Sequence, residues 1–151
     1  MKNSQGFTLI ELVVAMVIVG ILAAIAIPTY SNYTLKSHRT EAKAALLDAA
    51  SLEERYFSTN NSYSSTPSDL GYSGVVPFNV GNGYYQISAI TVAAPTAPTG
   101  TTAGTPATYS ITATAVGNQA SDVSCATYTI TSAGVTTATG TDPNASVDCW
   151  K

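Results

Sequence analysis

The feature that most constrains this chain is an almost unbroken apolar stretch, residues 7–27, close to its amino terminus. A short polar segment with one positive charge, Lys2, precedes it, and Glu11 is the only charged residue inside it. At 1.5 Å per residue, these 21 residues would form a helix of about 31 Å, enough to cross the hydrocarbon core of a bilayer. A carboxylate at the bilayer centre costs about 2.5–3.5 kcal/mol, so we expect Glu11 to have a functional partner.

Two ordinary explanations of this stretch compete with a specialised one. A secretory signal peptide would use Lys2 as its positive region and Ala24-Ile25-Ala26 as its small-x-small cleavage site. Such peptides usually have an apolar core of about 7–15 residues, whereas this one is longer and contains Glu11. A plain membrane anchor agrees with the length of the stretch but does not explain the carboxylate.

Helical periodicity continues beyond the apolar stretch as far as Phe57. Apolar residues recur there at spacings of three, four or seven, and Ala, Leu, Glu and Lys are frequent. The predicted apolar stripe consists of Leu35, Ala42, Ala45, Leu46, Ala49, Leu52, Tyr56 and Phe57. A single helix over residues 7–57 would be about 75 Å long, which a chain of this size cannot bury. Its first half must therefore lie in a membrane or against other copies of the chain.

Short strands are predicted after the helix. Residues 63–83 are rich in Gly and Pro and are predicted to be a loop, followed by strands at 84–93, 108–116 and 126–132 and a possible short one at 135–139. Residues 95–106 are dense in Thr, Ala, Gly and Pro and predict an exposed loop. Because no helix separates the strands, antiparallel pairing is favoured. The expected class is α+β, with the apolar stripe on one face of a three- or four-stranded antiparallel sheet.

Catalytic patterns do not appear in the sequence. It has one histidine, His38, and it lacks a Gly-x-Ser-x-Gly motif, a phosphate-binding glycine loop and a cluster of metal ligands. His38, Glu53 and Glu54 are predicted to lie on the solvated surface of the helix. Only 10% of the residues are charged, with six Lys+Arg against nine Asp+Glu, which argues against a basic nucleic-acid footprint. We therefore expect no enzyme, no cofactor, no metal and no specific nucleic-acid site.

The two cysteines, Cys125 and Cys149, form an even count, which in an exported chain indicates a disulfide. Closing a loop of this size contributes about 3–3.5 kcal/mol in the chain-entropy model. Two reduced, buried thiols are the alternative.

Residues Gly6-Phe7-Thr8-Leu9-Ile10-Glu11, the apolar run behind them and Pro28 resemble the amino-terminal signature of type IV pilins of the IVa class. The resemblance covers about the first third of the chain. It implies cleavage after Gly6 by a membrane-embedded peptidase, which then methylates Phe7. It also implies a leader at 1–6, a membrane and filament-core helix at 7–30 that protrudes from the head, and a globular head at 31–151.

The same resemblance implies roles for particular residues. Glu11 would meet the positive amino terminus, Phe7, of an incoming subunit, and two unit charges 4 Å apart attract by about 4 kcal/mol at an effective dielectric near 20, before desolvation. The segment from Gly20 to Pro28 would be unwound in the filament, with a simple proline kink as the alternative. Cysteines near the carboxy terminus of type IV pilins commonly staple a loop to the sheet.

The function that the resemblance implies is that of a structural subunit of a type IV pilus, used for adhesion, twitching motility or DNA uptake. Its partners would be other copies of itself, the prepilin peptidase and methylase, the pilus assembly machinery, and the inner membrane before it reaches the cell surface. Segments such as Cys149-Trp150-Lys151 resemble PilE-type pilins, many of which are minor components. A minor pilin is therefore an alternative.

A pseudopilin of a type II secretion system is a second alternative. Asp142 and Asp148 leave a faint possibility of bound calcium, but the two cysteines disfavour this reading. DNA binding by the head and electron conduction by aromatic residues are less favoured. The positive residues available for DNA are Lys36, Arg39, Lys43, Arg55 and Lys151. The aromatic residues considered for conduction are Phe7, Tyr30, Tyr33, Tyr56 and Phe57.

Overall fold

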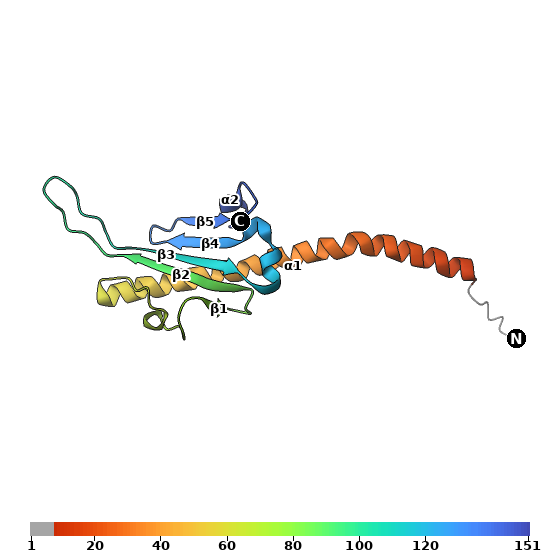
Figure 1. The fold of residues 1–151 in the computed structure, drawn as a ribbon, viewed down its shortest axis with the longest axis horizontal. Helices are drawn as coiled ribbons and strands as arrows, with labels where there is room; N and C mark the ends of the chain where they lie inside the picture. The colour runs from red at the N-terminus through yellow and green to blue at the C-terminus, as the bar shows by residue number, and fades with distance from the viewer. Residues whose placement is uncertain (1–7) are drawn as a thin grey trace. The chain divides into compact units, whose positions relative to one another are not determined.

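The computed structural model describes residues 8–151, so Gly6 and Phe7 lie outside the described residues. Its elements follow in the order α1 Leu9–Asn60, η1 Pro67–Leu70, β1 Phe78–Val80, β2 Tyr85–Ala93, β3 Thr108–Ala115, η2 Gly117–Ser121, η3 Val123–Cys125, β4 Thr127–Thr131, β5 Thr136–Thr139 and α2 Ala145–Asp148 (Figure 1). The chain divides into two compact units, Met1–Leu35 and Lys36–Lys151, and each is described by itself.

The second half of α1 belongs to the larger unit and provides one side of its core. Its fully buried residues, Ala42, Leu46, Ala49 and Glu53, follow one another at spacings of four, three and four. Such spacing places them on one face of a helix, and this face lies against the sheet (Figure 1). The predicted apolar stripe is thus confirmed at its centre, and Glu53, which was not part of the predicted stripe, also lies on the buried face.

All five strands form one antiparallel sheet in the order β1-β2-β3-β4-β5. Side chains of β3 alternate between the core and the outer face, with Tyr109, Ile111, Ala113 and Ala115 buried, as the alternation in the sequence predicted. Ile111 pairs with Ile90 of β2 on one side and with Ile130 of β4 on the other. The α+β class and the antiparallel pairing are confirmed.

The number of strands was predicted wrongly, because the sheet has five rather than three or four. The additional strand is β1, which lies within the segment predicted to be a loop. Its three residues are too few to show an alternating pattern, and Pro77 and Gly81 flank it closely. It forms because Phe78 pairs with Ile87 at the edge of β2, which is a tertiary contact rather than a local preference.

The opposite edge of the sheet is covered by the carboxy-terminal segment. The Ser146 hydroxyl accepts the N–H of Ala138 at 3.3 Å and donates to the carbonyl of the same residue at 3.2 Å. The Trp150 indole N–H donates to the carbonyl of Thr137 at 2.8 Å. These bonds occupy backbone groups of β5 that would otherwise be open to another strand, which is how natural sheets prevent edge-to-edge association.

Candidate functional site

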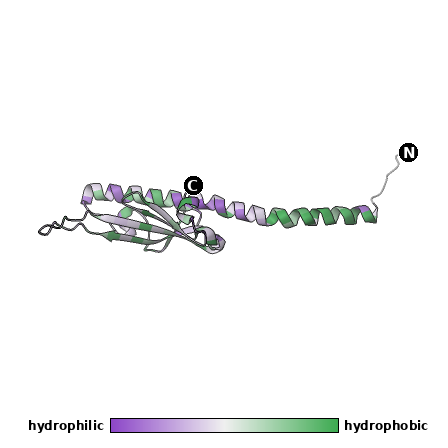
Figure 2. Cartoon of the chain, turned by 90° about the horizontal axis from the view of Figure 1, so that it is seen from above, coloured by the Kyte–Doolittle hydropathy of each residue, from purple (hydrophilic) through white to green (hydrophobic). Residues whose placement is uncertain are grey.

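The described part of the smaller unit consists almost entirely of the apolar first half of α1. Its large side chains are exposed, from 45% at Val13 to 80% at Leu9. An 18-residue window of α1 has a mean hydropathy of 2.9, and none of it is buried within the chain. By length and composition this helix is able to cross a membrane. Figure 2 shows that the first half has mostly the hydrophobic colour, with a hydrophilic turn near its amino-terminal end, whereas the second half has mixed colours.

Glu11 lies in the first turn of this helix and is exposed. The Thr8 hydroxyl accepts the backbone N–H of Glu11 at 3.3 Å, and the Thr8 carbonyl accepts that of Leu12 at 3.2 Å. The helix therefore begins immediately after Thr8, which caps it. A negative side chain in a first turn is also favoured by the helix dipole. The predicted partner of Glu11, the amine of Phe7, lies outside the described residues.

Gly20 and Pro28 both lie inside α1, which is continuous from Leu9 to Asn60. Proline removes one helical hydrogen bond, and directly after it the Thr29 hydroxyl donates to the carbonyl of Ile25 at 2.9 Å. A Cβ added at Gly20 would meet nothing within 4 Å. The predicted unwinding of this segment concerns the assembled filament, and for the filament it stays a prediction.

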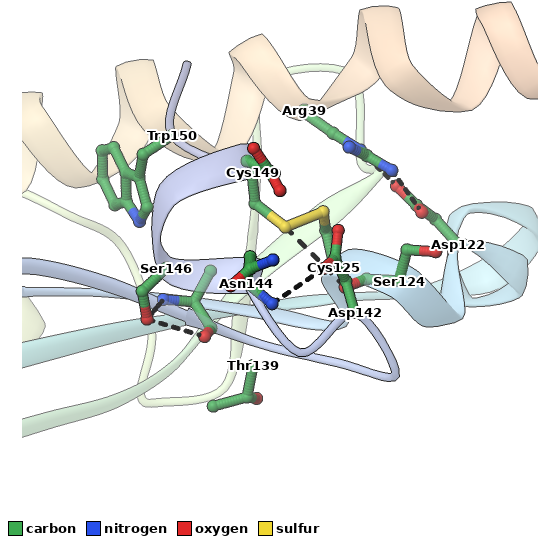
Figure 3. Close-up of a disulfide and its surroundings, with 12 residues drawn as sticks. Arg39, Asp122, Ser124, Cys125, Thr139, Asp142, Asn144, Ser146, Cys149 and Trp150 are labelled. Carbon is green, nitrogen blue, oxygen red and sulfur yellow. Dashed lines mark hydrogen bonds and ion pairs between the residues drawn. A yellow bond between two sulfur atoms is a disulfide. The ribbon is translucent and has the colours of Figure 1, made fainter.

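The disulfide between Cys125 and Cys149 is present, as predicted, with a Cα–Cα distance of 5.9 Å (Figure 3). Cys125 is 0% exposed and Cys149 is 1% exposed. The bond connects the last residue of η3 to the residue that follows α2, and it encloses β4 and β5 in a covalent loop.

A buried ion pair lies beside this disulfide and was not predicted. Arg39 on α1 donates from Nε to Asp122 Oδ2 at 2.7 Å and from Nη2 to Asp122 Oδ1 at 2.8 Å (Figure 3). The two side chains are 13% and 5% exposed. The hydrogen bond to Asp122 raises the pKa of Arg39 above its ordinary value against the opposing effect of burial. The pair fixes the segment before Cys125 to α1.

Gln119 extends this polar network to His38. The Gln119 amide group donates from Nε2 to the Tyr85 hydroxyl at 3.0 Å, which leaves Oε1 to face His38 Nδ1 at 3.0 Å. Because Oε1 can only accept, Nδ1 of His38 carries the proton. His38 also stacks on Tyr84 with a centroid distance of 3.6 Å. The prediction that His38 is a plain surface residue was therefore wrong, since it is half-buried and held on two sides.

Glu41 holds the turn between β1 and β2. Its Oε2 accepts the backbone N–H of Asn82 at 2.9 Å and the side-chain amide at 3.0 Å, while Oε1 accepts the N–H of Tyr84 at 3.1 Å. Gly81 allows this close approach, because an added Cβ would lie 2.7 Å from Glu41 Cδ. The Gly-Asn-Gly sequence indicated a turn, but no pattern in the sequence indicated that Glu41 of the helix would bind this turn.

The surface prediction was also wrong for Glu53. Glu53 is 0% exposed, whereas the adjacent Glu54 is exposed and accepts the Tyr63 hydroxyl at 3.1 Å. Successive helical residues point about 100° apart. One of two neighbouring glutamates can therefore face the core while the other faces solvent.

Most positive side chains of the described head are already occupied. Arg39 binds Asp122, Lys151 pairs with Asp148, and Lys43 donates to the carbonyl of Lys151. Asp148 is thus engaged with a lysine, and Asp142 accepts the N–H of Asn144 at 2.8 Å. Within residues 8–151, no group of three His, Cys, Asp or Glu side chains is arranged to hold a metal ion.

These observations define a class of protein: an α+β head with a carboxy-terminal disulfide, preceded by an apolar helix of membrane length with a carboxylate in its first turn. Sequence comparison identifies the family within that class. A family described as "Type IV minor pilin ComP, DNA uptake sequence receptor" matches residues 28–129, and the "Prokaryotic N-terminal methylation motif" matches residues 1–27. The chain belongs to the type IV pilins, and within them to the family matched over residues 28–129.

Individual relatives are similar over part of the chain. The type IV major pilin protein PilA of Myxococcus xanthus is 38% identical over 88 residues, which cover 58% of this chain and 38% of that protein. The wide pilus major component PilA4 of Thermus thermophilus is 40% identical over 82 residues (53% and 63%), and the major pilin PilE1 of Neisseria gonorrhoeae is 36% identical over 88 residues (52% and 49%). The chain thus spans about half the length of the curated relatives it matches.

Proposed function

We propose that this chain is a structural subunit of a type IV pilus, cleaved after Gly6, methylated at Phe7 and polymerised through the first half of α1. In this proposal residues 1–6 are the leader, residues 7–30 are the membrane and filament-core helix, and residues 31–151 are the head. The observation that carries the proposal is the apolar first half of α1. Its large side chains are not covered by any other part of the chain that the structure describes, and its one charge lies in its first turn.

A helix that is apolar on every face needs apolar surroundings on every face. The bilayer provides them for the precursor in the inner membrane, and other copies of α1 provide them in a filament on the cell surface. Apolar helices can slide along one another, so a charged contact is needed to fix their register. Glu11 provides it by meeting the Phe7 amine of the next copy, with an attraction of about 4 kcal/mol at 4 Å before desolvation is subtracted.

The partners that follow are the prepilin peptidase and methylase, the pilus assembly machinery and other pilin subunits. Adhesion, twitching motility and DNA uptake are the activities through which such a filament would act. The relatives compared above are named as major pilins or major pilus components, whereas the matched family is described as a minor pilin. Abundance in the filament distinguishes these two roles.

The test is the mass of the intact chain and of its amino-terminal peptide in filaments sheared from native cells, for the natural chain and for Glu11→Gln. We expect methylated Phe7 as the first residue and a dominant amount in the sheared fraction. Glu11→Gln should still be cleaved after Gly6 but should disappear from the filaments. A trace amount in sheared filaments would indicate a minor pilin or a pseudopilin. A chain that starts after Ala26 or keeps Met1 would overturn the proposal.

DNA binding is a second candidate, because the matched family is described as a DNA uptake sequence receptor. The charges oppose it. Within the described head, Lys36 and Arg55 are the positive side chains outside the contacts named above, and the sequence of the head contains eight acidic residues. Strong DNA binding requires several phosphate contacts and weakens steeply with salt. Salt-sensitive retention of duplex DNA on native filaments, lost in Lys36→Ala/Arg55→Ala, would support the receptor role, and retention that the two substitutions leave unchanged would oppose it.

A further inference from the structure

Two acidic side chains are buried in the described part of the chain, and only one of them has a positive partner. Asp122 is 5% exposed and is neutralised by the bidentate contact with Arg39. Glu53 is 0% exposed, and no ion pair reaches it within residues 8–151. A buried carboxylate without a cation is costly when it is charged, so its ionisation should be coupled to a change in its surroundings.

The contacts of Glu53 identify the segment to which it is coupled. Oε2 accepts the backbone N–H of Ser64 at 3.1 Å, whereas Oε1 is buried without a hydrogen-bond partner. The Ser64 hydroxyl donates to Asp69 at 2.6 Å and accepts the N–H of Thr66 at 3.1 Å. Glu53 therefore holds the residue from which the connection between α1 and β1, residues 61–77, is organised.

The charged groups that act on Glu53 within residues 8–151, Glu54 and Asp69, both disfavour a negative charge on its carboxyl. Glu54 lies on the same helix and Asp69 on η1, while the phenols of Tyr63 and Tyr109 approach from the loop and from β3. Burial above all raises the pKa of Glu53, and Glu54 and Asp69 raise it further, against the Ser64 N–H, which lowers it. The geometry is that of an enclosed acid that is stable when its unpartnered oxygen carries a proton.

We propose that Glu53 is a pH-sensitive latch, closed when the carboxyl is neutral, that keeps residues 61–70 docked on α1. When the pH rises, the Oε1 proton passes to water and leaves a charge that the enclosed site cannot solvate. The segment around Ser64 then opens to let water reach the carboxylate. The Tyr72 hydroxyl donates to Asp48 at 2.9 Å and anchors the chain to α1 just beyond residue 70, so opening is confined to residues 61–70.

The sign of the effect follows from proton linkage. A carboxyl whose pKa is higher when closed than when open favours the closed state at low pH. That preference is lost as the pH rises from the ordinary glutamate value through the raised one. Between these two values the opening equilibrium constant should increase tenfold for each pH unit, since one proton is released.

Hydrogen exchange of the full chain in detergent micelles tests the latch, with peptides covering residues 61–70 and intrinsic rates corrected for pH. We expect protection in the natural chain to fall by up to tenfold per pH unit above the ordinary glutamate pKa. Glu53→Gln should abolish this dependence, because the amide keeps the acceptor for Ser64 and cannot ionise. The matched control, Glu54→Gln, should keep it.

Carbon-13 titration of the glutamate carboxyls in the natural chain provides a second readout that does not depend on any variant folding. One carboxyl should titrate above the ordinary range, and the opening of residues 61–70 should follow the same midpoint. An ordinary pKa for Glu53 would overturn the proposal. So would a pH dependence of exchange that is unchanged in a folded Glu53→Gln protein.

Discussion

Replacement of Arg39 by methionine tests the most consequential contact in the head. The change removes the guanidinium but keeps much of the apolar stem, so the main effect is on Asp122. That carboxylate is 5% exposed, and its remaining partner is the Gln119 amide, 3.4 Å from Oδ2. Removing one partner of a buried ion pair typically costs 3–5 kcal/mol, because the other charge stays buried. With the weak Gln119 contact left in place, we expect the lower end, about 3 kcal/mol.

Lys151→Met is the matched control, since it also removes a cation from an ion pair in the same unit. The Lys151–Asp148 side chains are 68% and 41% exposed, and exposed pairs contribute only about 0–1 kcal/mol. For a unit of this size, 1 kcal/mol shifts the melting temperature by about 4 °C. We therefore expect a decrease of about 12 °C for Arg39→Met and at most about 4 °C for the control.

The assay is thermal unfolding of the full chain in detergent micelles, followed by the fluorescence of Trp150. It is the only tryptophan, and its ring lies 5.7 Å from that of Tyr128 in the core. The double variant Arg39→Met/Asp122→Asn removes both charges and should recover at least half of the loss. If Arg39→Met unfolds within 4 °C of the natural chain, or if the double variant is no more stable than the single one, the attribution to a stranded charge is refuted.

Two further substitutions test the covalent and conformational constraints on the same unit. Replacing both Cys125 and Cys149 by serine opens a loop with a sequence separation of 24. The chain-entropy model predicts that this change lowers the free energy of unfolding by about 3.5 kcal/mol. A loss below about 1 kcal/mol in urea unfolding would mean that the packing of α2 stabilises this part of the head without the bond. Gly81→Ala should destabilise by about 1 kcal/mol more than Gly83→Ala. Both glycines have positive φ (53° and 83°), but only at Gly81 would the new Cβ collide with Glu41, and equal losses would show that backbone strain alone decides.

The elements that could be predicted from the sequence are those whose cause is local. Alternation at Tyr109, Ile111 and Ala113 predicts β3 and its buried face, because a strand places every second residue on one side. The spacing of Ala42, Leu46 and Ala49 predicts the buried face of α1 in the same way. Each of these patterns lies within a dozen residues, so no knowledge of distant partners was needed.

The elements that were missed depend on partners far away in the chain. Asp122 follows Arg39 by 83 residues, and neither residue differs in sequence from an ordinary surface charge. Strand β1 exists because β2 offers it an edge, and its three residues show no periodicity of their own. Glu53 lies four residues after Ala49 on the buried face, but its charge led to the prediction that it lies on the solvated surface. The position of Glu53 on the helix, rather than its charge, determines that it is buried. As a result, Oε2 accepts a hydrogen bond while Oε1 has no partner.

The two halves of α1 differ in how their apolar residues are distributed around the helix, and this difference is relevant to the role of Glu11. After Lys36 the buried positions recur every three or four residues, which is the pattern of a helix covered on one side by its own sheet. Before Pro28 large apolar residues are exposed on every face, so no single surface of the same chain would satisfy them. Whatever covers that half must surround it, as a bilayer or a bundle of identical helices does. We therefore propose that the Glu11 carboxylate, in the first turn of this helix, is compensated by a group from outside the helix. On this proposal, the substitution Glu11→Gln should affect assembly while leaving the unfolding temperature of the head unchanged.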